Sequence, residues 1–261
     1  MPRLHLFEIL DQQWCPSTVR DGATDCLEAV IGATDVYGSV REEMLNAIQR
    51  TGAIRVVDLC SGGGGPWLSQ VWTSRLDREL DLRVALTDKF PSRVLCERLG
   101  RTSRITSFVK PVDATNVPQE LSGFRTVFSS FHHFPDAMAS KILADAVAAG
   151  EGFASAEATS RSVRALLTMF LVPLLAWVLT PAIRPFRWSR IFLTYVLPVI
   201  PFVLLWDGIV SCLRTRTPEE LLALARPFGD FHWKAGYSRG SWLPAVYLIG
   251  IPRKDAAERV A

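Results

Sequence analysis

The feature that most limits the fold of this chain is an apolar run that ends in an acidic residue and a cluster of glycines. Residues 54–57 are Ile, Arg, Val and Val, and Asp58 follows them; four consecutive glycines occupy residues 62–65. A short apolar run before a carboxylate is typical of a buried strand whose end meets ligand at the carboxyl edge of a sheet. Glycines let the backbone adopt positive φ and approach a ligand closely. The pattern therefore predicts a site for a nucleotide-type cofactor.

Two common nucleotide motifs do not fit this run. A dinucleotide fingerprint, G-x-G-x-x-G, would need its third glycine at Trp67 or Leu68. A phosphate-binding P-loop needs Lys and then Ser or Thr after its last glycine, whereas residues 66–69 are Pro, Trp, Leu and Ser. The sequence thus disfavours NAD, ATP and GTP.

Two later strand candidates also end near an aspartate. Asp88 follows residues 82–87, and Asp113 follows residues 106–110 after Pro111 and Val112. An ionised aspartate only accepts hydrogen bonds, so Asp88 suits the two hydroxyls of a ribose and Asp113 suits an adenine amino group. Each acid taken singly fits a turn or a helix cap equally well. Three acids in this order favour the cofactor site.

At this point the chain resembles the class I S-adenosylmethionine-dependent methyltransferases, over residues 35–159 and more weakly to the C-terminus. The first motif of that family is two apolar residues followed by Asp-Leu-Gly-x-Gly-x-Gly. Asp58, Leu59, Gly62 and Gly64 match it, and Cys60 stands where the first glycine is usual. The resemblance implies an α/β fold with a Rossmann-like, seven-stranded mixed sheet, and S-adenosylmethionine as cofactor. It also implies that Asp88 holds the ribose and Asp113 the adenine.

The resemblance further implies that residues 124–130 form the fourth strand, with Ser130 at the cofactor, and that residues 131–134 line the methyl-transfer face. A base is needed only where the methyl acceptor must lose a proton. We expect His133 in that role, narrowly before His132, because neutral imidazole accepts a proton near pH 7. Glu157, at the end of the fifth strand, is the alternative. Packing on the cofactor suits either histidine as well, and a salt bridge to a nearby arginine suits Glu157.

Composition excludes several classes of partner. The formal net charge of +3 over 261 residues is too small to indicate nucleic acid. The five cysteines include no C-x-x-C pair and no metal-ligand spacing, so we expect reduced thiols in the cytosol and no metal. The N-terminal residues 1–10 lack the long apolar run of an export signal.

Two long apolar stretches are the second informative feature. Residues 165–183 and 191–206 contain no charged residue, and Arg184, Arg187 and Arg190 lie between them. Each stretch approaches the roughly 20 residues that span a bilayer, but prolines interrupt both. Crossing would export three arginines, against the positive-inside rule. We therefore expect a helical hairpin that enters one leaflet with its basic tip at the lipid phosphates; burial in an oversized core or a homodimer interface is the alternative.

These observations predict four segments. Residues 1–50 would form a helical lid, residues 51–160 the cofactor-binding core, residues 161–213 the apolar hairpin insertion, and residues 214–261 a helix and the closing antiparallel strands. The favoured function is a methyltransferase on the cytoplasmic face of a membrane that acts on a lipophilic small molecule. A cytosolic methyltransferase that dimerises through the hairpin, or a non-enzymatic membrane adaptor that binds S-adenosylmethionine, are the alternatives.

Overall fold

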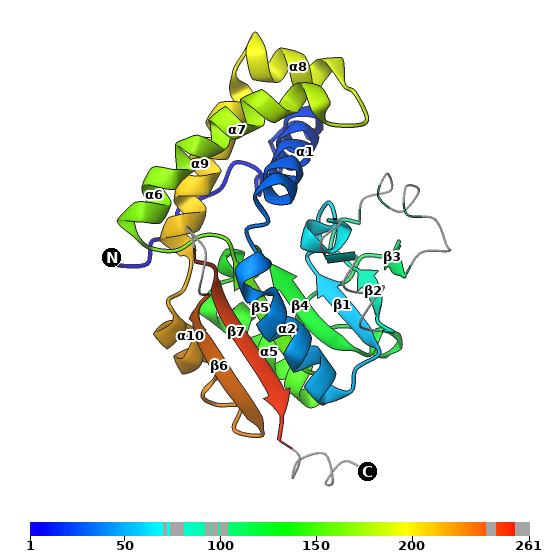
Figure 1. Ribbon diagram of the computed structural model, residues 1–261. Helices are drawn as coiled ribbons and strands as arrows, with labels where there is room; N and C mark the ends of the chain where they lie inside the picture. Colours follow the sequence, from blue (N-terminus) through cyan, green and yellow to red (C-terminus); the bar gives the residue numbers. More distant parts are fainter. Residues whose placement is uncertain are drawn as a thin grey trace. The chain divides into compact units, whose positions relative to one another are not determined.

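The computed structural model divides the chain into two units (Figure 1), and it describes residues 1–69, 72–73, 81–91, 95, 99, 104–238 and 244–253. Tyr37–Ala158 and Thr217–Ala261 form the first, which we call the sheet unit. Met1–Val36 and Thr159–Arg216 form the second, which we call the helical unit. The expected lid of residues 1–50 is therefore divided between the units, and its covering of a cofactor stays a prediction.

The sheet unit contains a seven-stranded mixed sheet in the order β3-β2-β1-β4-β5-β7-β6. The first five strands pair in parallel, and β7 runs antiparallel to both β5 and β6. This confirms the predicted sheet and its closing antiparallel strands. The strands are β1 (Arg55–Leu59), β2 (Arg83–Leu86), β3 (Ile105–Ser107), β4 (Phe124–Phe128), β5 (Phe153–Glu157), β6 (Phe231–Tyr237) and β7 (Val246–Pro252).

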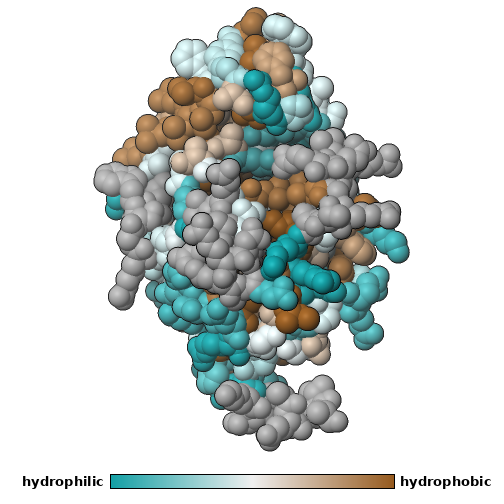
Figure 2. All heavy atoms as spheres, turned by 45° about the vertical axis from the view of Figure 1, so that its right-hand side comes forward, coloured by the Kyte–Doolittle hydropathy of each residue, from teal (hydrophilic) through white to brown (hydrophobic). Residues whose placement is uncertain are grey.

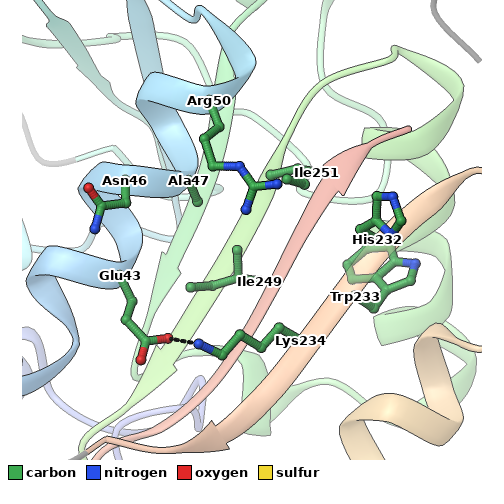
Figure 3. A pocket seen from close by; sticks show the side chains of 9 residues that line it. All are labelled: Glu43, Asn46, Ala47, Arg50, His232, Trp233, Lys234, Ile249 and Ile251. Atoms are coloured by element: carbon green, nitrogen blue, oxygen red, sulfur yellow. Dashed lines mark hydrogen bonds and ion pairs between the residues drawn. The ribbon is translucent and has the colours of Figure 1, made fainter. Parts of the chain in front are cut away.

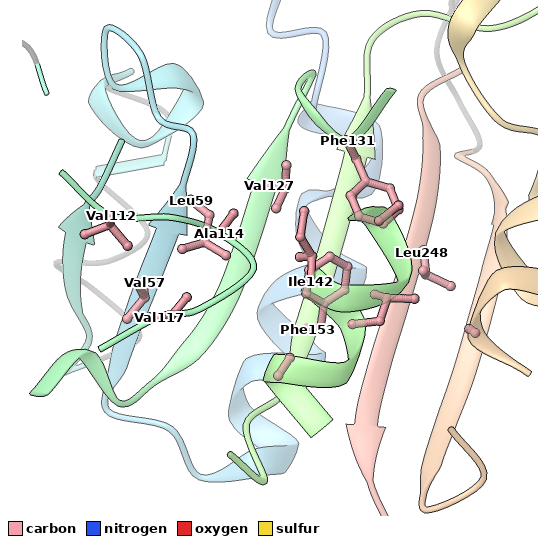
Figure 4. Packing of buried hydrophobic residues seen from close by; sticks show 14 of the residues in the cluster. Val57, Leu59, Val112, Ala114, Val117, Val127, Phe131, Ile142, Phe153 and Leu248 are labelled. Carbon is pink, nitrogen blue, oxygen red and sulfur yellow. The ribbon is translucent and has the colours of Figure 1, made fainter. Parts of the chain in front are cut away.

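Helices pack on this sheet because its central strands are apolar on both faces. An apolar cluster joins Val57 of β1, Val127 of β4 and Phe153 of β5 to α5 and α10 (Figure 4). Among the described residues of this unit, the helices are α2 (Gly38–Thr51), α5 (Asp136–Ala148) and α10 (Pro218–Ala225), with the short 3-10 helices η1 (Gly65–Leu68), η2 (Gln119–Leu121) and η3 (Phe131–His133). Helix α10 begins with a capping box between Thr217 and Glu220.

The helical unit is built from α1 (Ser17–Thr34), α6 (Val163–Met169), α7 (Leu171–Leu179), η4 (Thr180–Ala182), α8 (Trp188–Tyr195) and α9 (Val199–Arg214). The two apolar stretches thus form several short helices. Their prolines lie at helix starts, where a missing N–H costs little: Pro173 in the first turn of α7, Pro198 at the N-cap of α9 and Pro201 in its first turn. A separate core holds the helices together, with Ala23 and Cys26 of α1 against Ala176 of α7 and Ile200 of α9.

The expected basic tip is largely neutralised by α1. Arg190 is 1% exposed and forms an ion pair with Asp25, and it also donates to two backbone carbonyls that precede it. Arg187 lies 3.5 Å from Asp21 and 3.8 Å from Asp25. Of the three arginines only Arg184 is classed as exposed. The prediction of three arginines at lipid phosphates is therefore wrong for Arg190, because the acid that pairs with it, Asp25, lies in a helix 165 residues earlier.

The N-terminal segment is fastened to α9 by buried polar groups. Asp207 accepts hydrogen bonds from the backbone amides of Ile9 (2.7 Å) and Leu10 (3.0 Å), and burial raises its pKa to about 6. Arg214 donates to Glu8 at 3.0 Å and to Asp11 at 3.2 Å. This segment is therefore an integral part of the helical unit.

Within the described part of the chain, one helical stretch, Val163–Ala182, is long and apolar enough to cross a membrane, with a mean hydropathy of 2.0 and 22% of its residues buried. The α8–α9 pair passes the same test only as a bent pair, since the two axes differ by 73°. Length and composition alone do not distinguish a membrane helix from a helix that lies against another protein.

Candidate active site

The glycine-rich turn after β1 has the backbone that a cofactor cradle requires. Gly62 (φ 53°), Gly64 (φ 111°) and Gly65 (φ 54°) have positive φ, and so does Cys60 (φ 57°). Cys60 thus adopts the left-handed conformation at the position where the resembled family usually has glycine. A Cβ at Gly62 would have no atom within 4 Å, so space is open beside this backbone. The loop fits a ligand that approaches along the main chain.

Asp58 lies at this edge and has a strongly raised pKa. Its carboxyl is 1% exposed, and Oδ1 accepts a hydrogen bond of 2.5 Å from the Thr126 hydroxyl on β4. Burial raises its pKa to about 7, although the hydrogen bond from the Thr126 hydroxyl acts in the opposite direction. Asp58 therefore changes charge near neutral pH. Its neighbour Leu59 lies in the apolar core, so only its backbone is left for a cofactor contact.

Asp88 joins the end of β2 to the glycine turn. Its Oδ2 accepts from the Gly62 amide at 3.0 Å, and its Oδ1 accepts from the Phe90 amide at 2.8 Å. The Ser61 amide donates to the Thr87 carbonyl at 3.0 Å, which ties the two strand ends together. The structure thus brings Asp58, Gly62 and Asp88 to one edge of the sheet, as the order of the parallel strands requires.

Asp113 lies close to this group, but its side chain is used locally. The Val112 amide donates to the Asp88 carbonyl at 2.9 Å, which fixes the segment beside β2. Oδ1 of the exposed Asp113 accepts from the Thr115 amide at 2.9 Å and from the Thr115 hydroxyl at 2.7 Å, and these bonds lower its pKa. Asp113 thus forms a local turn with Thr115, which is the alternative to a cofactor contact that its sequence position allowed. A contact to adenine stays a prediction.

A buried histidine–carboxylate pair lies at the ends of β4 and β5. Nδ1 of His132 is 2.6 Å from Oε2 of Glu157, and the His132 amide donates to Oε1 at 3.2 Å. Both residues are 3% exposed. An ionised carboxylate only accepts, so this pairing puts the proton on Nδ1 and makes Nε2 the acceptor atom of the ring. Glu157 thus pairs with the imidazole of His132, whereas the sequence also allowed a salt bridge to a nearby arginine.

The other predicted residues of this edge lie next to the pair. His133 is half-buried and stacks on His132, with ring centroids 4.3 Å apart and planes 30° apart. The Ser130 hydroxyl donates to the Phe128 carbonyl at 3.0 Å and lies 3.4 Å from the Cys60 carbonyl, beside the glycine turn. Ser130 therefore links the end of β4 to the turn after β1.

Sequence reasoning missed Tyr37 and Ser129. The Tyr37 hydroxyl donates to Ser129 at 2.6 Å, and the Ser129 hydroxyl accepts from the Ala158 amide at 3.1 Å. Tyr37 is 1% exposed, and burial raises its pKa. These bonds hold the ends of β4 and β5 to the start of α2. A lone tyrosine before a helix carries no spacing signal that would have identified it.

Two aromatic residues of the edge pack in the core and not toward open space. Trp67 is fully buried against Trp72 and Phe128, and Phe131 is 1% exposed against Phe153. This agrees with the packing role that aromatic residues most often have.

A pocket of about 220 Å³ lies elsewhere, between α2 and strands β6 and β7 (Figure 3). Its wall includes Arg50, His232 and the Lys234–Glu43 ion pair of 2.8 Å, and apolar side chains such as Ile249 and Ile251 complete the lining. None of the predicted cofactor or base residues lines it. The candidate active site is therefore not this pocket. It is the group of residues at the strand ends, which comprises Asp58, Gly62, Asp88, His132 and Glu157.

No family model matches this sequence, and no curated protein matches it either. Among solved structures, PigF with S-adenosylhomocysteine is similar over 92% of this chain and 63% of its own, with 16% identity and a TM-score of 0.54. Human N-acetylserotonin methyltransferase in complex with S-adenosylmethionine is similar over 90% of this chain and 56% of its own, with 15% identity and a TM-score of 0.50. The chain thus spans less than two thirds of either protein. Together with the strand order, these similarities show that the chain has the fold of the class I S-adenosylmethionine-dependent methyltransferases.

Proposed function

We propose that the protein is an S-adenosylmethionine-dependent methyltransferase that acts on a lipophilic small molecule at the cytoplasmic face of a membrane. The observation that carries the proposal is the meeting of Asp58, Gly62 and Asp88 at the edge of the sheet that also presents the His132–Glu157 pair. The residues suited to bind a cofactor and those suited to transfer a proton therefore lie at the same edge of the sheet unit.

The residues of this edge fit the proposed cofactor by their chemistry. Asp88 offers a carboxylate to the ribose hydroxyls, and Gly62 leaves open space beside its backbone. Asp58 lies buried at the turn, where a carboxylate attracts the amino group of the cofactor's amino-acid part. Asp113, with its lowered pKa, offers a second acceptor beside Asp88.

Bound S-adenosylmethionine would supply an electrophilic methyl group on a sulfonium. The chain has two tasks: it positions the acceptor, and it removes a proton where the acceptor is a hydroxyl. We assign the proton to Nε2 of His132 in preference to His133, because Glu157 fixes the tautomer and orientation of His132. Glu157 then acts as a positioning residue, which stabilises the imidazolium that forms.

Membrane association and a lipophilic acceptor are supported by the helical unit. Its most apolar helix, α7, contains nine residues, of which Ala176 alone is classed as buried. An enzyme held at a bilayer meets membrane-soluble acceptors at high local concentration. This part of the proposal predicts an acceptor that partitions into membranes.

Cofactor binding is tested by calorimetric titration of S-adenosylhomocysteine into the wild-type protein and the Asp88→Ala variant in mild detergent. Losing charge-assisted hydrogen bonds, at about 1.5–3 kcal/mol each, predicts a loss of affinity of at least tenfold. Asp81→Ala is the matched control, because this exposed aspartate lies just before the same strand and forms a surface ion pair with Arg104 at 3.2 Å. Equal affinity in all three proteins would overturn the site assignment.

Methyl transfer is tested by incubating labelled S-adenosylmethionine with membrane-lipid extracts and following label in the organic phase. His132→Gln should retain S-adenosylhomocysteine binding and lose transfer by about 10²–10⁴-fold. Glu157→Gln should lower the rate and shift its pH profile, because the tautomer of His132 is no longer fixed. Binding without transfer to any extract would favour the non-enzymatic adaptor.

A further inference from the structure

The outward surface of α6 and α7 is a continuous apolar strip. Leu167, Leu171, Leu174 and Val178 recur at intervals of three or four residues, so they share one helical face. Each is more than half exposed, and Val178 reaches 72%. On the opposite side Ala176 is buried in the core against α1 and α9. The helix is therefore packed on one side only.

The bend between α8 and α9 extends this strip. Phe192, Val196 and Leu197 are 47%, 64% and 51% exposed around the 73° bend. The Tyr195 hydroxyl donates to the Trp177 carbonyl, and their rings lie 5.6 Å apart, which joins the end of α8 to α7. We call the strip and the bend together the apolar face. Figure 2 shows brown, apolar surface gathered on these helices at its upper end.

Charge and aromatic residues indicate a bilayer as the occupant of this face. Arg187 and Arg190 are paired with acids of α1, but Arg164 and Arg184 are exposed and carry the sign of charge that anionic lipids attract. Trp177, Trp188 and Tyr195 are exposed, and such rings are enriched at the boundary between headgroups and acyl chains. A soluble monomer rarely exposes an apolar patch of this extent.

The packing of α1 against the apolar helices limits how deeply the apolar face can enter a bilayer. Helix α1 packs against α7, α8 and α9 and carries Arg20, Asp21, Asp25 and Glu28. If the apolar helices crossed the bilayer, α1 would have to enter with these charges, or Arg190 would lose Asp25. Both alternatives place charged groups in hydrocarbon at high cost.

We propose that the helical unit is a preassembled anchor whose apolar face enters one leaflet of an anionic bilayer without crossing it. The proposal rests on the membrane association in the proposed function and not on methyl transfer. Because the Asp25–Arg190 pair already fixes the helices, the anchor docks as a folded body. Its polar side, with α1, stays at the headgroups.

Flotation with mixed phosphatidylcholine–phosphatidylglycerol vesicles tests the face. The double variant Leu174→Asp/Val178→Asp should lose vesicle partitioning at least tenfold, whereas Ile54→Asp, at a 77% exposed apolar residue of the sheet unit, should float like wild type. S-adenosylhomocysteine titration of each variant reports the sheet unit separately, so failure of the anchor is distinguishable from failure of the cofactor site. Equal flotation of all three proteins would overturn the proposal. It would also be overturned if the wild-type protein did not float but formed a dimer without lipid, and if the double variant were monomeric.

A labelling experiment tests the one-leaflet geometry. Arg184→Cys places a thiol at an exposed position before α8 that is normally charged and lies outside the apolar face, and the wild-type protein is the blank for its own cysteines. In sealed vesicles to which protein is added from outside, a membrane-impermeant maleimide should label this thiol as fast as it does in detergent. Protection until detergent opens the vesicles would mean that the helices cross, and would overturn the proposal.

Discussion

The two units use apolar residues in opposite ways. In the sheet unit all five residues of β4 are buried, Arg125 included. In the helical unit the nine-residue α7 has one buried residue, although its composition is more apolar. The apolar residues of β4 are accounted for by folding, because they form the core. Those of α7 are not, and this surplus is what the proposed membrane anchor accounts for.

Both units nevertheless contain a buried arginine that is paired with an aspartate from a neighbouring element. Arg125 pairs with Asp145 of α5, and Arg190 pairs with Asp25 of α1; their side chains are 4% and 1% exposed. The first pair joins elements 20 residues apart in sequence, and the second joins helices 165 residues apart. Each pair therefore connects a helix to a neighbouring element of its own unit.

The largest expected effect comes from breaking the pair in the helical unit. Asp25→Ala leaves the Arg190 charge buried and should lower the free energy of unfolding of that unit by about 3–5 kcal/mol. Urea unfolding followed by tryptophan fluorescence and by far-UV circular dichroism measures it. Arg190→Met added to Asp25→Ala should recover part of the loss, because no uncompensated charge remains. A double variant less stable than Asp25→Ala would contradict this account.

The next effect concerns the buried acid of the sheet unit. The pKa of Asp58 is raised from 3.8 to about 7, so the folded state keeps a proton that the unfolded chain releases. Stability should therefore fall as pH rises from about 4 to 7 and stay level above it. Asp58→Asn removes this slope and should be more stable at pH 8 by on the order of 3–4 kcal/mol, while it binds S-adenosylhomocysteine more weakly.

Thermal melts of both proteins between pH 4 and pH 8 check this prediction. Asp81→Asn is the control, because its side chain is 99% exposed and its pairing with Arg104 lies at the surface. Parallel pH profiles for wild type and Asp58→Asn would show that Asp58 is ionised throughout.

The sheet unit was largely predictable because its signals are local in sequence. Asp58 and Asp88 each follow an apolar run in the sequence, and parallel strands bring the ends of such runs to one edge. What sequence did not reveal depends on tertiary contacts. The choice of His132 over His133 rests on Glu157, which lies 25 residues later. Tyr37 reaches Ser129 across 92 residues.

The helical unit was less predictable for the same reason. The apolar stretches and their prolines are visible in the sequence, and so are the breaks between helices that the prolines cause. The arginines read as a basic tip because their partners Asp21 and Asp25 belong to α1, which nothing in the spacing connects to them. Charge patterns therefore predict surfaces poorly wherever a remote helix supplies the counter-charge.

A smaller effect distinguishes one glycine in each unit. Gly64 has φ 111°, and a Cβ there would lie 2.3 Å from a Leu68 methyl, so Gly64→Ala should cost about 1–3 kcal/mol and weaken S-adenosylhomocysteine binding. Gly208 lies within α9, and a Cβ there would meet the flexible Met169 side chain at 2.9 Å. Gly208→Ala should be near neutral, because the roughly 1 kcal/mol gain in helix propensity offsets the crowding. Equal costs in denaturant melts would contradict the distinction.

The smallest effect compares one helix cap in each unit. Ser162 accepts from the Ala165 amide at 3.1 Å at the start of α6, and Thr217 accepts from the Glu220 amide at 3.3 Å at the start of α10. Replacing either cap with alanine should cost about 1 kcal/mol. Because the caps belong to different units, hydrogen exchange should show faster opening in α6 to α9 for Ser162→Ala and in α10 and β6 for Thr217→Ala. If each variant instead accelerates exchange equally in both regions, the two units open as one, and the surplus apolar surface of α7 cannot be treated separately from the stability of the sheet.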